Sequence, residues 1–295
     1  IKSIGNIPGF FYRDGAPSVV RPVTMATFAI NYGLGGLNPF GYHCVNFLIH
    51  LLNAMLVYWF VMLTLKVSKY QSIKVSKLQR SKDSDTLTLG CSDTPPIAFL
   101  SSLLFALHPI QTGAVTYIAQ RAEILASFFY LLAIVMYIKF RMTQSAVSSQ
   151  LSAIGGQGLR FSKLNAKCYS LFAVAFLSAI LAMGSKEIAV TLPVTIILYE
   201  FIFISKGNLR ELSKQKAIYL MFFMMLVSFL YFMGLSQFKN LSVTGGVTPP
   251  PTSGEYVNKA LLSRYEYFLT QFRVIWTYIK ILIAPISQNL DYSYP

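Results

Sequence analysis

Cysteine is scarce in this chain, and its three copies lie far apart in the sequence. Cys44, Cys91 and Cys168 show no ligand-like spacing, and an odd number at such distances predicts neither a disulfide framework nor a zinc site. Residues 1–20 contain neither an apolar core nor a cleavage site, so no signal peptide is visible. We expect the cysteines to be small packing residues, and the chain to be a fragment whose first membrane span lies upstream.

Charged residues are also few, at 12% of the chain, whereas hydrophobic residues make up 54%. A soluble fold of 295 residues could not bury that much apolar surface, and the apolar runs reach membrane length. The sequence therefore predicts a polytopic membrane protein. Its formal net charge of +14 does not indicate a nucleic-acid partner, because the basic residues lie between apolar runs rather than in one stripe with stacking aromatics.

Apolar stretches predict six membrane spans and thus an all-α transmembrane bundle, a single domain over residues 1–295 without tandem repeats. The predicted spans are residues 41–65, 96–107, 121–140, 168–183, 188–204 and 217–235. Alternate connections carry 15 of the 25 basic residues, which predicts that these connections face the cytoplasm. Residues 1–40, 108–120, 184–187 and 236–259 are then expected on the periplasmic or lumenal side.

Three connections lack apolar periodicity. Residues 67–95 and 143–167 are rich in Ser, Lys, Gln and Gly, and we interpret both as flexible cytoplasmic loops. Residues 236–259 are expected to form an outer loop. Residues 261–285 differ from these, since Glu266, Arg273 and Lys280 recur every seven residues and share one polar stripe of a helix. This pattern favours a partly sunken interfacial helix on the outer face, and a tilted seventh span is the alternative.

Span lengths suggest where the functional site lies. Residues 96–107 would rise only about 18 Å as a helix, against a hydrocarbon layer of about 30 Å. His108, which follows this run, is therefore expected below the outer surface. Lys186 and Glu187 join two other short runs, so we expect a depression at the outer face.

Ionisable residues at this outer face are the candidates for chemistry, because charged groups at the mouth of a membrane bundle are costly to keep there. The candidate catalytic residues are Glu123, Glu187, Lys186 and His108. Either carboxylate could take a proton from a hydroxyl or hold a divalent metal ion, and the sequence leaves metal dependence open. The competing interpretation is that these residues only cap membrane spans.

Basic residues at the same face could bind the phosphate of a lipid-linked donor, with arginine offering a forked contact. The candidates are Arg21, Arg121, Arg273 and Lys280, and attraction to ordinary anionic lipid is the alternative. A separate polar stripe on residues 41–65 contains His43, Asn46, His50 and Asn53. We expect this stripe to form interhelical hydrogen bonds, with a metal-ligand role for His43 as the alternative.

Several motifs, taken in order, resemble one enzyme family. They are Arg21-Pro22-Val23-Thr24, Gly36-Leu37-Asn38-Pro39-Phe40-Gly41-Tyr42-His43, Phe105-Ala106-Leu107-His108-Pro109, Arg121-Ala122-Glu123, Gly184-Ser185-Lys186-Glu187 and Asn289-Leu290-Asp291-Tyr292-Ser293-Tyr294-Pro295. The chain resembles the transmembrane and tetratricopeptide-repeat (TMTC-type) O-mannosyltransferases and their bacterial relatives, within the GT-C glycosyltransferase fold.

The resemblance implies transfer of a hexose, expected to be mannose, from a polyprenyl-phosphate donor to a hydroxyl, with inversion, on the periplasmic or lumenal side. The acceptor would be protein Ser/Thr or a glycan, and the enzyme would lie in a bacterial inner membrane or the endoplasmic reticulum. The resemblance also implies a main acidic catalytic motif upstream of Ile1 and tetratricopeptide repeats further along. The alternatives are a transporter or flippase of a lipid-linked or anionic substrate, a ligase or acyltransferase acting on lipid-linked glycans, and a non-enzymatic membrane scaffold.

Overall fold

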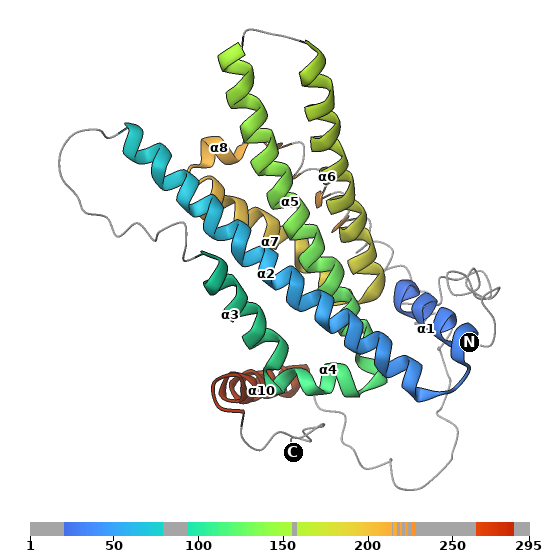
Figure 1. Ribbon diagram of the computed structural model, residues 1–295. Helices are drawn as coiled ribbons and strands as arrows, with labels where there is room; N and C mark the ends of the chain where they lie inside the picture. Colours follow the sequence, from blue (N-terminus) through green and yellow to red (C-terminus); the bar gives the residue numbers. More distant parts are fainter. Residues whose placement is uncertain are drawn as a thin grey trace, which may run out of the picture.

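A computed structural model shows a bundle of long helices (Figure 1). It describes residues 21–78, 94–154, 158–213, 215–216, 219, 222–223, 226–227 and 264–285. All regular elements within these ranges are helical, which confirms the predicted all-α class. Four described segments are long and apolar enough to cross a membrane, namely Pro39–Lys69, Ile118–Ala146, Cys168–Ser185 and Glu187–Ile204.

A fifth crossing is present if two helical segments that meet at a bend of 50°, Thr94–Leu107 and Pro109–Thr116, form one broken span. These segments confirm a polytopic bundle and match five of the six predicted spans. Most of the sixth predicted span, residues 217–235, lies outside the described residues. Helix α3 (Thr94–Leu107) ends directly before His108, where the predicted span 96–107 also ends, and its 14 residues rise about 21 Å.

Three helices extend beyond their predicted spans: α2 (Pro39–Leu78), α5 (Arg121–Ile154) and α6 (Gly158–Ser185). The structure therefore differs from the predicted loops 67–95 and 143–167, because residues 67–78, 143–154 and 158–167 are helical. A polar composition indicates contact with water and does not by itself exclude a helix. Once a span has nucleated, Lys, Gln and Leu continue it at little cost. The predicted outer loop 236–259 lies outside the described residues.

Small residues allow α5 and α6, which lie side by side in Figure 1, to approach closely. Ala175, Ala179 and Ala182 recur on one face of α6 and are fully buried, as is Ala133 of α5. Lipid tails are as apolar as leucine, so hydrophobicity alone does not hold two membrane helices together. Close van der Waals packing of such small residues does, and it makes the α5–α6 pair the rigid centre of the bundle.

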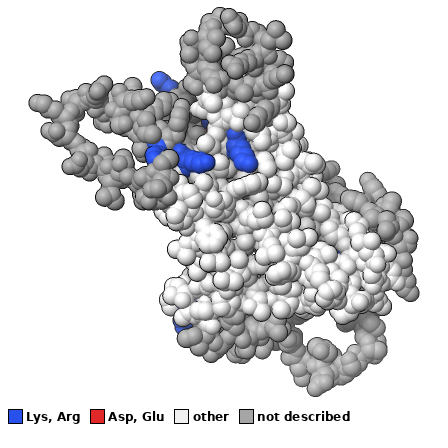
Figure 2. All heavy atoms as spheres, in the orientation of Figure 1, with Lys and Arg blue, Asp and Glu red and all other residues white. Residues whose placement is uncertain are grey.

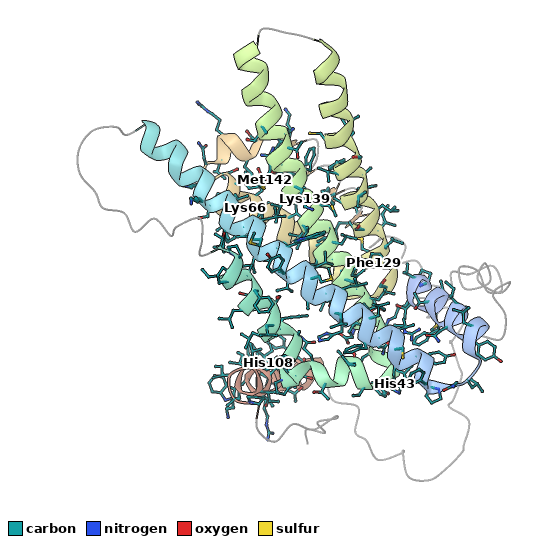
Figure 3. The ribbon with its side chains drawn as sticks, in the orientation of Figure 1. His43, Lys66, His108, Phe129, Lys139 and Met142 are labelled. Carbon is teal, nitrogen blue, oxygen red and sulfur yellow. The ribbon has the colours of Figure 1, made fainter. Side chains whose placement is uncertain are left out.

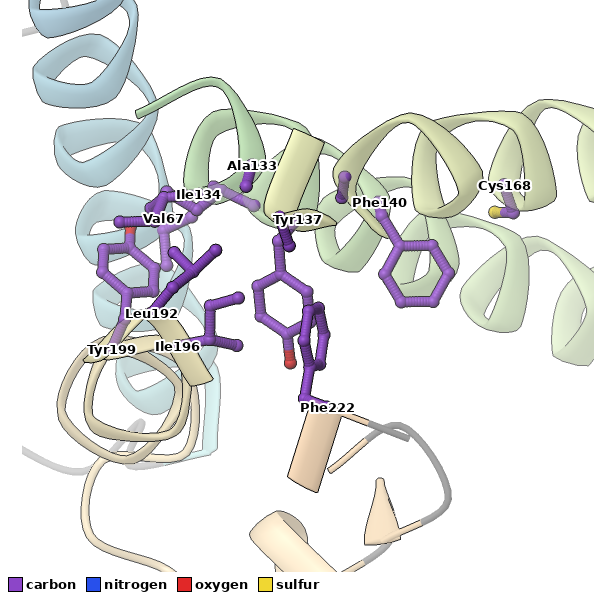
Figure 4. Close-up of a cluster of buried hydrophobic side chains, with 13 residues drawn as sticks. Val67, Ala133, Ile134, Tyr137, Phe140, Cys168, Leu192, Ile196, Tyr199 and Phe222 are labelled. Carbon is purple, nitrogen blue, oxygen red and sulfur yellow. The ribbon is translucent and has the colours of Figure 1, made fainter. Parts of the chain in front are cut away.

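A cluster of larger side chains joins this pair to α2 and to α7 (Leu192–Tyr199) (Figure 4). Tyr137 of α5 is fully buried there, and its ring packs edge to face with Phe222 at a centroid distance of 6.5 Å. Cys168 of α6 is buried in the same cluster, so its predicted packing role is confirmed. Cys44 is instead exposed on α2, so the predicted packing role is wrong for this residue. Cys91 lies outside the described residues.

The two ends of the bundle contain different segments of the chain. Helices α1 (Pro22–Gly35), α4 (Thr112–Thr116) and α10 (Arg264–Ile283) lie at the lower end in Figure 1, whereas α8 (Leu209–Ser213) lies toward the upper end. Segments predicted on the outer side thus gather at one end, and basic connections gather at the other. Which end faces the cytoplasm stays a prediction.

Helix α10 covers most of the predicted amphipathic segment 261–285. Figure 1 shows it nearly end-on, whereas α2, α5 and α6 run across the page, so its axis is steeply inclined to theirs. It is not among the candidate spans of the described residues. These observations favour the interfacial alternative over a seventh crossing.

Candidate functional site

The candidate site begins where α6 ends at Ser185. Lys186 has an extended backbone (φ −156°, ψ 147°), and the 3-10 turn η5 (Glu187–Thr191) follows it. Because one extended residue separates two helical segments, the side chains of Lys186 and Glu187 turn toward different neighbours. The predicted turn is therefore a two-sided junction, with Lys186 directed at α5 and Glu187 directed at α1.

Glu187 pairs with Arg21, the residue that precedes α1. Arg21 donates from Nε to Oε1 and from Nη2 to Oε2, both at 3.2 Å. Side-chain exposures of 41% for Arg21 and 33% for Glu187 leave this pair partly open. An ion pair this exposed adds little stability, but its forked geometry fixes the orientation of both groups. The pair is therefore suited to holding a guanidinium in place at the surface.

Lys186 pairs with Glu123, which lies in the first turn of α5. The lysine Nζ donates to Oε1 of Glu123, and the side-chain exposures are 22% and 45%. Sequence reasoning placed all four of these residues in one site. The structure brings them together as two adjacent cation–carboxylate pairs at the meeting point of α1, α5 and α6.

A close approach between α1 and α6 supports the two pairs. Thr24 Oγ1 donates to the Ser185 carbonyl at 3.0 Å, which ties the start of α1 to the end of α6. A Cβ atom placed on Gly184 would lie 2.7 Å from Cγ2 of Val23, closer than real Cβ contacts allow. Gly184 is therefore needed at this position because no side chain fits between the helices.

Arg121, the first residue of α5, is fully buried beside this junction. Its Nε donates to Asn46 Oδ1 at 2.8 Å, and its Nη2 donates to Asn31 Oδ1 and to the Tyr42 carbonyl, each at 3.0 Å. The guanidinium carbon also lies 4.5 Å from the ring centroid of Phe28. Arg121 was predicted to bind a donor phosphate, but these contacts occupy its guanidinium with atoms of α1 and α2. The geometry instead suits an anchor that holds α1 against the bundle.

Three residues of the polar stripe of α2, Asn46, His50 and Asn53, form interhelical hydrogen bonds, as predicted. Asn46 accepts from Arg121, His50 Nε2 lies 3.0 Å from the Ala106 carbonyl of α3, and Asn53 Nδ2 donates to the Ile124 carbonyl of α5 at 2.9 Å. These bonds fix α2 against α3 and α5. Among the described residues, no three His, Cys, Asp or Glu side chains gather to hold a metal ion.

The remaining predicted residues belong to a second group beside α10. His108 Nε2 lies 3.0 Å from the Leu282 carbonyl, and its Nδ1 accepts from the Ile110 backbone N–H at 3.2 Å (Figure 3). His108 therefore joins the corner after α3 to α10. Lys280 is exposed, with its Nζ 5.4 Å from the ring centroid of Trp276, and Arg273 is also exposed on this helix.

Sequence reasoning missed a buried cluster near the opposite end. Glu200 opens the π-helical turn η6 (Glu200–Ile204) and is fully buried. It accepts from Arg141 Nε at 3.1 and 3.0 Å and from the Tyr137 hydroxyl at 3.0 Å. The spacing of Tyr137 and Arg141, one helical turn apart on α5, is the signal that could have identified this cluster. Its bonds are all internal, so it fastens η6 to α5.

No family model matches the chain. No solved structure matches it either. Protein O-mannosyl-transferase Tmtc3 of Drosophila melanogaster is 39% identical over 119 residues, which cover 40% of this chain and 12% of that protein. Two human relatives are protein O-mannosyl-transferase TMTC4, 36% identical over 121 residues, and TMTC2, 31% identical over 147 residues.

The TMTC4 match covers 40% of this chain and the TMTC2 match 50%, and each covers 14% of the relative. The chain therefore corresponds to a small part of these proteins. The similarities agree with the resemblance that the motifs indicate: over 40 to 50% of its length, the chain is similar to TMTC-type protein O-mannosyl-transferases.

Proposed function

We propose that this chain forms most of the membrane domain of a glycosyltransferase that moves mannose from a polyprenyl-phosphate donor to a protein Ser/Thr hydroxyl. The observation that carries the proposal is the pair of ion pairs, Arg21 with Glu187 and Lys186 with Glu123, at the end opposite the basic connections. The names of the relatives, which are protein O-mannosyl-transferases, support the reaction class.

The charge change of the reaction explains why cations are needed. The bond between the anomeric carbon and the donor phosphate breaks, and a bond from the acceptor oxygen to that carbon forms. The donor is a phosphodiester with one negative charge, and the leaving lipid phosphate gains a second. Preorganised donors aimed at such developing charge supply a large part of catalysis. Arg21 and Lys186 fill this role in our proposal.

The two carboxylates have different roles. Both oxygens of Glu187 accept from Arg21, so Glu187 serves as a positioning residue for the guanidinium. Glu123 contacts Lys186 through Oε1 and is the more exposed acid, so it is the better candidate to interact with the acceptor hydroxyl. The hydroxyl proton passes to a carboxylate base, which the resemblance implies belongs to a separate acidic motif.

Helix α10 supplies the second contact with the donor in this proposal. Arg273 and Lys280 would attract the phosphate headgroup, and His108 would position α10 through its contact with Leu282. The exposed rings of Phe272 and Trp276 suit the isoprenoid chain at the membrane interface. We assign this end to the periplasm or the lumen, because the opposite end carries the basic connections.

A transfer assay tests the proposal. The reconstituted protein is given polyprenyl-phosphate mannose and a Ser/Thr peptide, and the variants Glu187→Gln, Lys186→Ala and Glu123→Gln are compared with the parent. Lys186→Ala is expected to lower the turnover rate about 100-fold, the usual effect of removing one donor to a developing negative charge. Arg210→Gln, an exposed change at the other end, should transfer normally. Full activity in all three site variants would reject the site.

A further inference from the structure

Two lysines lie near the end of the bundle opposite the candidate site, Lys66 on α2 and Lys139 on α5 (Figure 3). Lys66 follows Trp59 by seven residues and so lies on the same face of α2. The Lys139 Nζ lies 4.2 Å from the ring centroid of Trp59, a cation–π contact. Trp59 is itself 43% exposed, so this contact lies on the outside of the bundle rather than inside it.

The helix geometry places this pair at a membrane boundary. The hydrogen bond from Arg121 to Asn46 shows that these two residues, on α5 and α2, lie side by side at the candidate-site end. Lys139 follows Arg121 by 18 residues, and Lys66 follows Asn46 by 20 residues. At 1.5 Å per residue these intervals are about 27 and 30 Å, which is the thickness of the hydrocarbon layer. The backbones of both lysines therefore lie about one hydrocarbon thickness along their helices from Arg121 and Asn46, where the opposite membrane boundary is expected.

No carboxylate neutralises this pair within the part of the chain that the structure describes. The ion pairs found there are Arg21–Glu187, Arg141–Glu200 and Lys186–Glu123, and Glu200 is occupied by Arg141. Figure 2 shows blue side chains on the upper part of this face and no red among its described atoms. An ammonium held against a lipid-facing ring is costly unless an anion lies nearby.

We propose that Lys66, Lys139 and Trp59 form a binding site for the phosphate headgroup of an anionic phospholipid. The two ammonium groups bind the phosphate between α2 and α5, and the Trp59 ring holds Lys139 in place beside the first acyl carbons. Basic groups between membrane helices at a cytoplasmic surface are suited to such headgroups. This site is distinct from the proposed transferase site and does not depend on it.

Trp59 is a native reporter for the experiment. The chain has two tryptophans, so Trp276→Phe leaves Trp59 as the single source of tryptophan fluorescence. The chain is reconstituted in phosphatidylcholine vesicles that contain either brominated phosphatidylglycerol or brominated phosphatidylcholine in equal amounts. Bromine quenches tryptophan only at short range, so the ratio of quenching reports the lipid beside Trp59. We expect a preference for the anionic lipid of about fivefold for each lysine.

Charge variants make the test decisive. The double variant Lys66→Gln, Lys139→Gln should quench equally with both lipids, whereas the double change to arginine should keep the preference. Arg210→Gln, a charge removed elsewhere at this end, should leave the preference unchanged. Equal quenching by both lipids in the parent, or a preference that survives the double glutamine change, would overturn the proposal. If the double variant loses helicity by circular dichroism, the two single glutamine variants decide, each expected to lower the preference about fivefold.

Discussion

Replacement of Arg121 by methionine should release α1 from the bundle. The change removes the hydrogen bonds to Asn46, Asn31 and the Tyr42 carbonyl, and it leaves these acceptors buried. Interhelical hydrogen bonds in membranes average about 0.6 kcal/mol, so the loss of three should lower the free energy of unfolding by at least about 2 kcal/mol. Removal of one partner from a buried charged network lowers the free energy of unfolding by at most about 5 kcal/mol. At about 2 to 4 °C per kcal/mol, the unfolding midpoint should fall by about 4 to 20 °C.

A thiol-reactive dye can measure this shift. Replacing Cys44 and Cys91 by serine leaves Cys168, a buried thiol on α6, which reacts only when the bundle opens. Arg121→Lys should fall between the parent and Arg121→Met, because an ammonium cannot make the forked contacts of a guanidinium. Arg210→Met, at an exposed site, should melt with the parent. An unchanged midpoint for Arg121→Met would refute the anchoring role of Arg121.

Two further changes test the packing and the buried cluster, both followed through the Cys168 thiol. Gly184→Ala should destabilise the protein by about 1 to 3 kcal/mol because the new methyl group clashes with Val23. The double change with Val23→Ala should restore most of this loss. If it does not, the close approach of α1 and α6 at Gly184 is wrong. Glu200→Gln should lower the free energy of unfolding by about 3 kcal/mol because it leaves Arg141, whose side chain is only 13% exposed, without its anion, and the double change with Arg141→Met should recover part of the loss. If Glu200→Gln and its double change with Arg141→Met have the same free energy of unfolding, the pairing of Arg141 with Glu200 is wrong.

The sequence was sufficient to predict the spans and the polar stripe of α2. Apolar length determines whether a segment can cross a membrane, so the spans over α2, α5 and α6 were predictable without knowledge of their neighbours. Asn46, His50 and Asn53 recur on one face of an apolar helix, and polar groups in such surroundings must find partners. Their partners in α3 and α5 followed only from the structure.

Contacts between distant segments could not be predicted, because hydrophobicity does not determine how a helix is rotated about its axis. Arg21 and Glu187 are separated by 166 positions, and nothing local indicates that they face one another. The sequence predicted that Arg121 lies at the outer surface because Arg121 begins a membrane span. Arg121 is buried in part by Asn31 and Phe28, which belong to α1, a different segment of the chain. The helical continuation of α2 and α5 into polar residues was missed because composition predicts solvation rather than backbone conformation.

In the proposed function, Arg21 and Lys186 together bind the phosphate of a lipid carrier. The most direct measurement is the dissociation constant of a short-chain polyprenyl monophosphate for the parent and for the double variant Arg21→Gln, Lys186→Gln. Charged hydrogen bonds of this kind contribute about 1.5 to 3 kcal/mol each, so the double variant should bind at least about 100-fold more weakly while its Cys168 thiol stays protected. Unchanged affinity in a folded double variant would contradict the account.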